Sequence, residues 1–136
     1  MTRLELAPSR TLATAIVIAH GLAALAAWTV LPGLMGVALA CALLGLGAAA
    51  AWSRALLGAR GSLRAVQLEA GKAAFELADG RRLEAPEGGR RYVTRHVLAV
   101  PLGGMLERTA LVTADMLPPG EFRRLRIWAL WNRQPS

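Results

Sequence analysis

The fold is decided by residues 11–53, TLATAIVIAHGLAALAAWTVLPGLMGVALACALLGLGAAAAWS, which contain no Asp, Glu, Lys or Arg. The apolar run is broken once, at Pro32 and Gly33. A helix that crosses a bilayer needs roughly 20 mostly apolar residues, and residues 11–31 and 34–52 each approach that length. Because a Pro-Gly pair belongs at the water interface, we expect two transmembrane helices joined by a very short turn at residues 32–33.

A cleaved secretory signal peptide is the main alternative to this hairpin. Arg3 and Arg10 precede an apolar run, and residues 24–26 are compatible with a cleavage site. Cleavage would leave the second apolar segment as the only anchor, whereas an uncleaved hairpin accounts for both segments and for the break between them. We therefore predict a hairpin over residues 11–60, preceded over residues 1–10 by a polar leader too short to fold alone.

The placement of charge and tryptophan suggests how the hairpin is oriented. The formal net charge is +7, and Arg10 and Arg54 flank the apolar segments while the turn between them has no basic residue. The positive-inside rule then places both termini in the cytoplasm. Trp28 and Trp52 lie near the ends of the segments, where an indole suits the membrane interface. These four residues are the predicted interface residues.

Small residues are frequent in both apolar segments, at spacings that let two helices approach closely. They include Gly21, Ala24, Gly36, Ala40, Gly45 and Ala49. In a chain so rich in alanine, such spacings also arise by chance.

After Ser53 the sequence changes to short apolar runs separated by turn signals. Residues 61–136 are sufficient for one small domain only. We expect a small α+β cytoplasmic domain, an antiparallel β meander closed by a C-terminal helix over residues 118–132, because Pro118 and Pro119 suit the first turn of a helix. The strands are expected at residues 63–68, 73–77, 81–84, 92–100 and 108–114, with turns at 70–71, 79–80 and 103–104.

The C-terminal helix is expected to be amphipathic. The apolar stripe predicted to pack on the sheet consists of Phe122, Leu125, Trp128 and Ala129. The arginines Arg123, Arg124 and Arg126 fall mostly outside that stripe. Ile127, Leu130 and Trp131 widen the apolar surface beyond the needs of a small sheet, which leaves part of it available for the bilayer or for another protein.

His20 is the sharpest single candidate for chemistry, because an ionisable group inside a membrane span is costly unless it is neutral or paired. It is either a neutral imidazole bonded to a backbone carbonyl or hydroxyl of the neighbouring helix, or a proton-sensitive contact between the spans. No Asp, Glu, Lys, Arg or second His lies in the spans, which argues against a proton relay. His96 has no partners at metal-ligand spacing, and catalytic motifs are not found. We therefore expect no enzyme, cofactor or metal.

Arginines also cluster in the β region, at Arg81, Arg82, Arg90, Arg91 and Arg95. Such a cluster suits anionic lipid head groups or an acidic protein surface. A solvated basic face beside an anionic membrane is an equally good interpretation. Specific nucleic-acid binding is not expected, because exposed aromatics are not interleaved with the cations.

Three patches of the chain together resemble the YgfX family of small bacterial inner-membrane proteins, also called toxin CptA. They are residues 6–10 (LAPSR), residues 18–21 (IAHG), and residues 114–116 (ADM) leading into residues 122–126 (FRRLR). The resemblance implies a multi-pass protein of the bacterial inner membrane. It also implies a small soluble partner of the SdhE (CptB) type, which acts in flavin attachment to succinate dehydrogenase, and for some members a toxin action on tubulin-like and actin-like bacterial proteins. Residues 70–104 carry no motif that we can match.

Two hypotheses follow for the function. In the first, the hairpin anchors a cytoplasmic domain that docks a soluble partner through Arg123, Arg124, Arg126 and Trp131, with Arg90 and Arg91 as further contacts to the partner or to anionic lipid. In the second, the protein is a lipid-sensing or structural membrane module with a pleckstrin-homology-like barrel.

Overall fold

The computed structural model describes residues 2–69, 71–86, 88–103 and 108–131. These residues form two compact units. The hairpin unit comprises Ser9–Gly58, and the β unit comprises the residues before Ser9 together with those from Ala59 onward. Each unit has its own core, so they are described separately.

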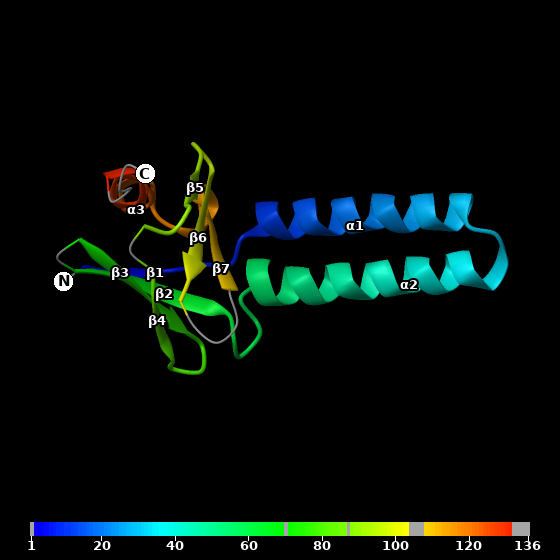
Figure 1. Cartoon of the computed structure of the whole chain (residues 1–136), viewed down its shortest axis with the longest axis horizontal. Helices are drawn as coiled ribbons and strands as arrows, with labels where there is room; N and C mark the ends of the chain where they lie inside the picture. Colours follow the sequence, from blue (N-terminus) through cyan, green and yellow to red (C-terminus); the bar gives the residue numbers. More distant parts are fainter. Residues whose placement is uncertain (1, 70, 87, 104–107, 132–136) are drawn as a thin grey trace. The chain divides into compact units, whose positions relative to one another are not determined.

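The hairpin unit consists of α1 (Arg10–Val30) and α2 (Gly33–Ala50), which lie side by side in opposite directions (Figure 1). A π-helical turn, η1 (Ala51–Ala55), continues α2. The chain reverses at Pro32 and Gly33, and Gly33 adopts a φ of +68° that glycine tolerates without strain. Both helices are long and apolar enough to cross a membrane, by length and composition alone. The predicted pair of apolar helices with a Pro-Gly turn is confirmed.

The two helices meet along a seam of buried and half-buried residues that recur every three or four positions. On α1 this seam includes Ile16, His20, Ala24 and Ala27, and it continues to Leu31 just after the helix. On α2 it includes Gly36, Ala40, Leu43 and Gly47, and it continues to Ala51 at the start of η1. Small residues therefore face the partner helix, while large apolar side chains such as Leu22 and Leu46 point outward.

Ser9 caps the N-terminus of α1. Its Oγ accepts a hydrogen bond from the Leu12 backbone N–H at 3.0 Å, and its own N–H donates to the Ala55 carbonyl at 2.8 Å. We expect Ser9→Ala to destabilise the hairpin unit by about 1 kcal/mol, because one helix N–H loses its acceptor. Thermal unfolding in mild detergent measures this loss. Thr14→Ala is the control, since that exposed hydroxyl only donates to the Arg10 carbonyl of its own helix, and an equal loss there would contradict the capping role.

The β unit contains two antiparallel sheets followed by a helix (Figure 1). The first sheet has the order β1 (Thr2–Glu5), β2 (Leu63–Glu69), β3 (Lys72–Leu77) and β4 (Arg82–Glu84). The second has the order β5 (Tyr92–Val93), β6 (Val97–Leu102) and β7 (Arg108–Thr113). A 3-10 turn, η2 (Ala114–Met116), leads into α3 (Pro119–Trp131). The predicted antiparallel strands followed by a C-terminal helix are thus confirmed. Asn132, the last residue of the predicted helix, and residues 70 and 104 of two predicted turns lie outside the described residues.

The leader was not expected to be a structural element, and the structure corrects this. Its residues 2–5 form β1, which pairs with β2 in the register Leu4↔Val66. Leu4 is fully buried and Leu6 is nearly so, whereas Arg3 and Glu5 between them are exposed. This alternation is the pattern of a strand with one buried face. The segment is too short to fold alone, but β2 provides the partner strand that it needs.

The single strand predicted over residues 92–100 is also corrected, because the chain turns back within it. Thr94 makes the turn: its N–H donates to the Val97 carbonyl at 2.8 Å, and its Oγ accepts from the Val97 N–H at 2.8 Å. The hydroxyl also accepts from the His96 N–H at 3.3 Å. A threonine that bonds to nearby backbone competes with sheet pairing, so β5 and β6 become a hairpin.

The core of the β unit lies between the sheets and α3. Its largest fully buried side chains are Phe75, Leu4, Leu98, Met116, Leu125, Val66, Val100 and Val112. On α3 the predicted stripe is confirmed, since Phe122, Leu125 and Ala129 are buried and Trp128 is half-buried.

At the turn between β3 and β4, the backbone N–H of Arg81 donates a hydrogen bond to the Asp79 carboxylate, and the Arg81 side chain donates another. These hydrogen bonds, first of all the one from the backbone, lower the pKa of the Asp79 carboxyl.

Candidate binding surface on the C-terminal helix

The outward face of α3 combines cations with large apolar side chains. Arg123 and Arg124 are exposed and Arg126 is half-buried. Beside them Ile127 and Leu130 are about two-fifths exposed, and the Trp131 side chain is 83% exposed. The expected surplus of apolar surface on this helix is therefore present. Exposed tryptophan and arginine side by side are typical of surfaces that bind other molecules.

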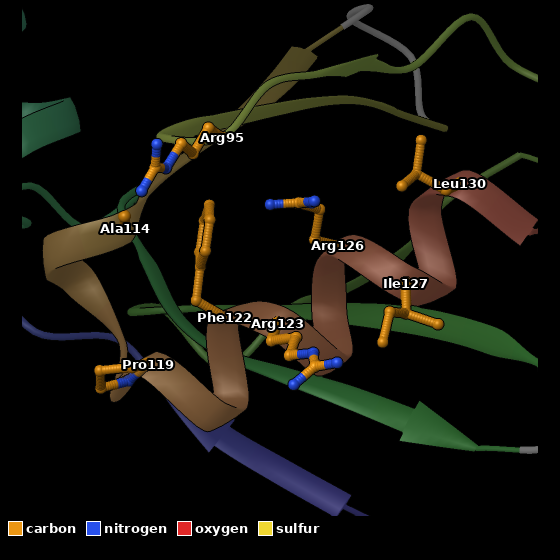
Figure 2. A pocket seen from close by; sticks show the side chains of 8 residues that line it. All are labelled: Arg95, Ala114, Pro119, Phe122, Arg123, Arg126, Ile127 and Leu130. Carbon is orange, nitrogen blue, oxygen red and sulfur yellow. The ribbon is translucent and has the colours of Figure 1, made fainter.

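Two neighbouring hollows lie between α3 and the hairpin of β5 and β6, and together we call them the α3 groove. Figure 2 shows the residues that line the larger hollow. The larger has a volume of about 480 Å³ and the smaller about 360 Å³. The larger is lined by Arg95, Ala114, Pro119, Phe122, Arg123, Arg126, Ile127 and Leu130. The smaller is lined by Val93, Thr94, Arg95, Arg126 and Leu130.

Arg95 and Arg126 line both hollows, although they come from different elements. Arg95 lies in the turn after β5, and Arg126 lies in the middle of α3. Figure 2 shows the Phe122 ring rising from α3 toward Arg95, with the guanidinium of Arg126 directed to the same side. The groove thus has an apolar base with cations above it.

The charge of the groove is uncompensated within the described ranges. No Asp or Glu lines either hollow, and Arg95, Arg123 and Arg126 form no ion pair with the described acidic residues. Two other surface arginines of the β unit do have acidic partners: Arg81 Nε lies 2.7 Å from Asp79, and Arg3 lies 3.5 Å from Glu76. An arrangement of this kind attracts an anion, because the guanidinium groups have no carboxylate of their own.

Arg90 and Arg91 were both expected to contribute to an exposed basic surface, and they differ in the structure. Arg90 is exposed, whereas Arg91 is only 8% exposed. The Arg91 guanidinium lies over the Trp128 ring, 4.2 Å from its centroid, which is a cation–π contact. The Trp128 indole N–H in turn donates to the Gly71 carbonyl at 2.6 Å. Arg91 therefore helps to hold α3 in place and is removed from the predicted binding surface.

The interface residues predicted in the hairpin unit are accessible. Arg10, Arg54, Trp28 and Trp52 are all exposed. Trp28 lies near the turn between the helices and Trp52 lies in η1, where its ring packs against Gly58.

His20 is half-buried in the seam between α1 and α2. Its Nδ1 lies 2.9 Å from the Ile16 carbonyl oxygen, so Nδ1 carries a proton and donates to its own helix, not to the neighbouring one. His20 lies against Gly47 of α2, whose lack of a side chain makes room for the imidazole. The position of His20 thus corresponds to a packing contact with a satisfied ring nitrogen.

The sequence did not single out the groove, because its parts are distant along the chain. In the sequence Arg95 is only one of five arginines in the β region, and the helical period indicates Phe122 only as a core residue. The Thr94-Arg95-His96 turn was the missing signal, since it brings Arg95 toward α3.

Among the described residues, no three His, Cys, Asp or Glu side chains are grouped as metal ligands would be. No model of a known protein family, no curated protein and no solved structure matches this chain significantly.

Proposed function

We propose that this protein is a membrane-anchored interaction module. In this proposal α1 and α2 span the bacterial inner membrane with both termini in the cytoplasm, and the β unit docks a soluble protein through the outward face of α3. The observation that carries the docking role is the set of uncompensated arginines beside the exposed side chains of Ile127, Leu130 and Trp131. The apolar outer surfaces of α1 and α2 support the anchor.

The partner that best fits is a small acidic protein. Arginine and tryptophan are the residue types that most often dominate binding energy at protein interfaces. Uncompensated positive charge accelerates encounter with an acidic surface. The resemblance to the YgfX family suggests an SdhE-type flavinylation factor as that partner. The same resemblance also suggests an effect on tubulin-like or actin-like proteins.

Charge reversal on α3 tests the docking surface. We expect the double variant Arg123→Glu and Arg124→Glu to reduce recovery of an SdhE-type protein by at least about tenfold, since hydrogen bonds to charged groups contribute roughly 1.5–3 kcal/mol each. The measurement is affinity purification of the tagged full-length protein from native membranes in mild detergent, with the partner quantified by mass spectrometry. The hairpin unit alone should recover none.

The matched control is Arg64→Glu and Arg82→Glu, which changes net charge equally at exposed positions on β2 and β4. Recovery with this variant should stay within about twofold of the parent protein, because surface charges away from an interface contribute little to affinity. Equal losses in both double variants would show that only net charge matters. Unchanged recovery with the α3 variant would reject this face as the docking surface.

A lipid-binding role is the second candidate, and the fold favours it in one respect. Antiparallel sheets of four and three strands followed by a helix are the order of elements in a pleckstrin-homology-like barrel. Because β1 belongs to the first sheet, this role is best tested with the full chain in nanodiscs and not with residues 61–136 alone. Salt-sensitive protection of α3 from hydrogen exchange, seen in anionic but not in zwitterionic lipid, would support it.

A further inference from the structure

We propose that the α3 groove binds an acidic peptide segment in which an apolar side chain lies between two carboxylates. This inference rests on the proposed docking function and specifies the chemistry of the segment that the partner presents. The groove is the place where the cations and the apolar surface of α3 converge with the turn after β5.

The cations of the groove differ in which hollow they line. Arg95 and Arg126 line both hollows from opposite elements, whereas Arg123 lines only the larger one. Arg123 and Arg126 are three residues apart on a helix, a spacing that places their Cβ atoms roughly 5–6 Å from each other. A guanidinium group binds a carboxylate with two parallel hydrogen bonds. Two carboxylates of one short segment can therefore be bound at the same time.

The apolar part of the groove accounts for the side chain between the carboxylates. Phe122 forms the base, and Ile127 and Leu130 border the larger hollow while remaining partly exposed. A hollow of about 480 Å³ has room for one large aliphatic or aromatic side chain. Filling it would remove apolar surface of both partners from water.

This mixed lining favours a peptide over a lipid head group. A head group presents phosphate and hydroxyl groups, which would satisfy the arginines but leave Phe122, Ile127 and Leu130 against polar atoms. An acidic peptide with an apolar residue satisfies both kinds of lining. The groove also extends past Arg126 to Val93 and Thr94, so a segment of several residues has a continuous surface on which to lie.

The test uses the purified full-length protein in mild detergent and a fluorescein-labelled synthetic peptide in which leucines alternate with pairs of glutamates. Fluorescence anisotropy at low salt measures its affinity. We expect Arg95→Gln and Arg126→Gln each to weaken binding about tenfold, which corresponds to the loss of one charge-assisted contact. Arg64→Gln is the control, and it should change affinity less than about twofold because Arg64 is exposed on β2 and does not line the groove.

A second peptide, with serine in place of leucine, should bind at least about fivefold more weakly, because its side chain leaves the apolar hollow unfilled. Equal losses for Arg64→Gln and Arg126→Gln, or equal binding of the leucine and serine peptides, would overturn the inference in favour of diffuse attraction. Vesicles of phosphatidylglycerol that bind in an Arg126-dependent manner, with no peptide binding, would overturn it in favour of lipid.

The partner assay separates this inference from the proposed function. If Arg95→Gln weakens peptide binding but leaves recovery of the SdhE-type protein unchanged, the groove is not where that partner docks, and the docking role of α3 still stands. If both fall together, the groove is the docking site. Because Arg95 is in an exposed turn, its replacement leaves the core intact, which keeps the result interpretable even if Arg126→Gln disturbs α3.

Discussion

Replacing Leu4 with alanine is expected to lower the free energy of unfolding of the β unit by about 2–5 kcal/mol, the usual cost of truncating a buried leucine. Leu4 is fully buried and lies opposite Val66 on β2. Hydrogen exchange of the full-length protein in detergent, followed by mass spectrometry, measures the change locally. Amides of β2 and β3 should exchange roughly 30-fold to several thousand-fold faster where exchange requires unfolding of the whole unit.

Glu5→Ala is the control for this prediction, because Glu5 is the next residue of the same strand and is exposed. It should change the free energy of unfolding by no more than about 0.5 kcal/mol, as is usual for surface positions. If Leu4→Ala left the exchange of β2 unchanged, the leader would contribute nothing to the stability of the sheet.

The parts of the fold that sequence predicts well are those whose signal is local. An uninterrupted apolar run with one Pro-Gly break specifies two helices and the turn between them, because both the period and the breaker lie within the segment. The boundaries of α3 are also close to prediction. There Pro119 begins the helix, and the spacing of Phe122 and Leu125 among the arginines matches the helical period of 3.6 residues.

The parts that sequence misses depend on partners distant in the chain. Residues 2–5 form a strand only because β2, on the far side of the hairpin unit in the sequence, offers an edge. The prediction of one strand over residues 92–100 is wrong for a different reason, which is local. A threonine suits a strand by propensity, but the Thr94 hydroxyl bonds to two backbone N–H groups and ends β5.

The candidate site shows the same division. Exposure of Arg123 and Arg124 follows from the helical period alone, and it was predicted. Arg90 and Arg91 are neighbours in the sequence, yet Arg91 is buried against Trp128, a contact that no local pattern reveals. Likewise, Arg95 and Arg126 line the same hollow only because the β5–β6 hairpin lies beside α3.

Gly47→Ala is expected to destabilise the hairpin unit by about 1–3 kcal/mol, the usual cost of adding a methyl group to a closely packed site. A Cβ atom at Gly47 would lie 2.6 Å from the Cβ of His20 and 2.8 Å from its Cγ. The Cβ of His20 is fixed to the backbone of α1, so no change of rotamer relieves this overlap and the two helices must separate. Unfolding of the purified protein by titration with SDS, followed by far-UV circular dichroism, measures the loss.

Gly45→Ala is the matched control, since it lies two residues away on the same helix and a Cβ there meets no atom within 4 Å. Alanine is favoured over glycine inside a helix by about 1 kcal/mol, so this variant should be as stable as the parent protein or more so. The same replacement is thus expected to have opposite signs at two neighbouring glycines. If both variants were equally stable, α1 and α2 would not approach closely at His20, and the seam of small residues would not be what holds the hairpin together.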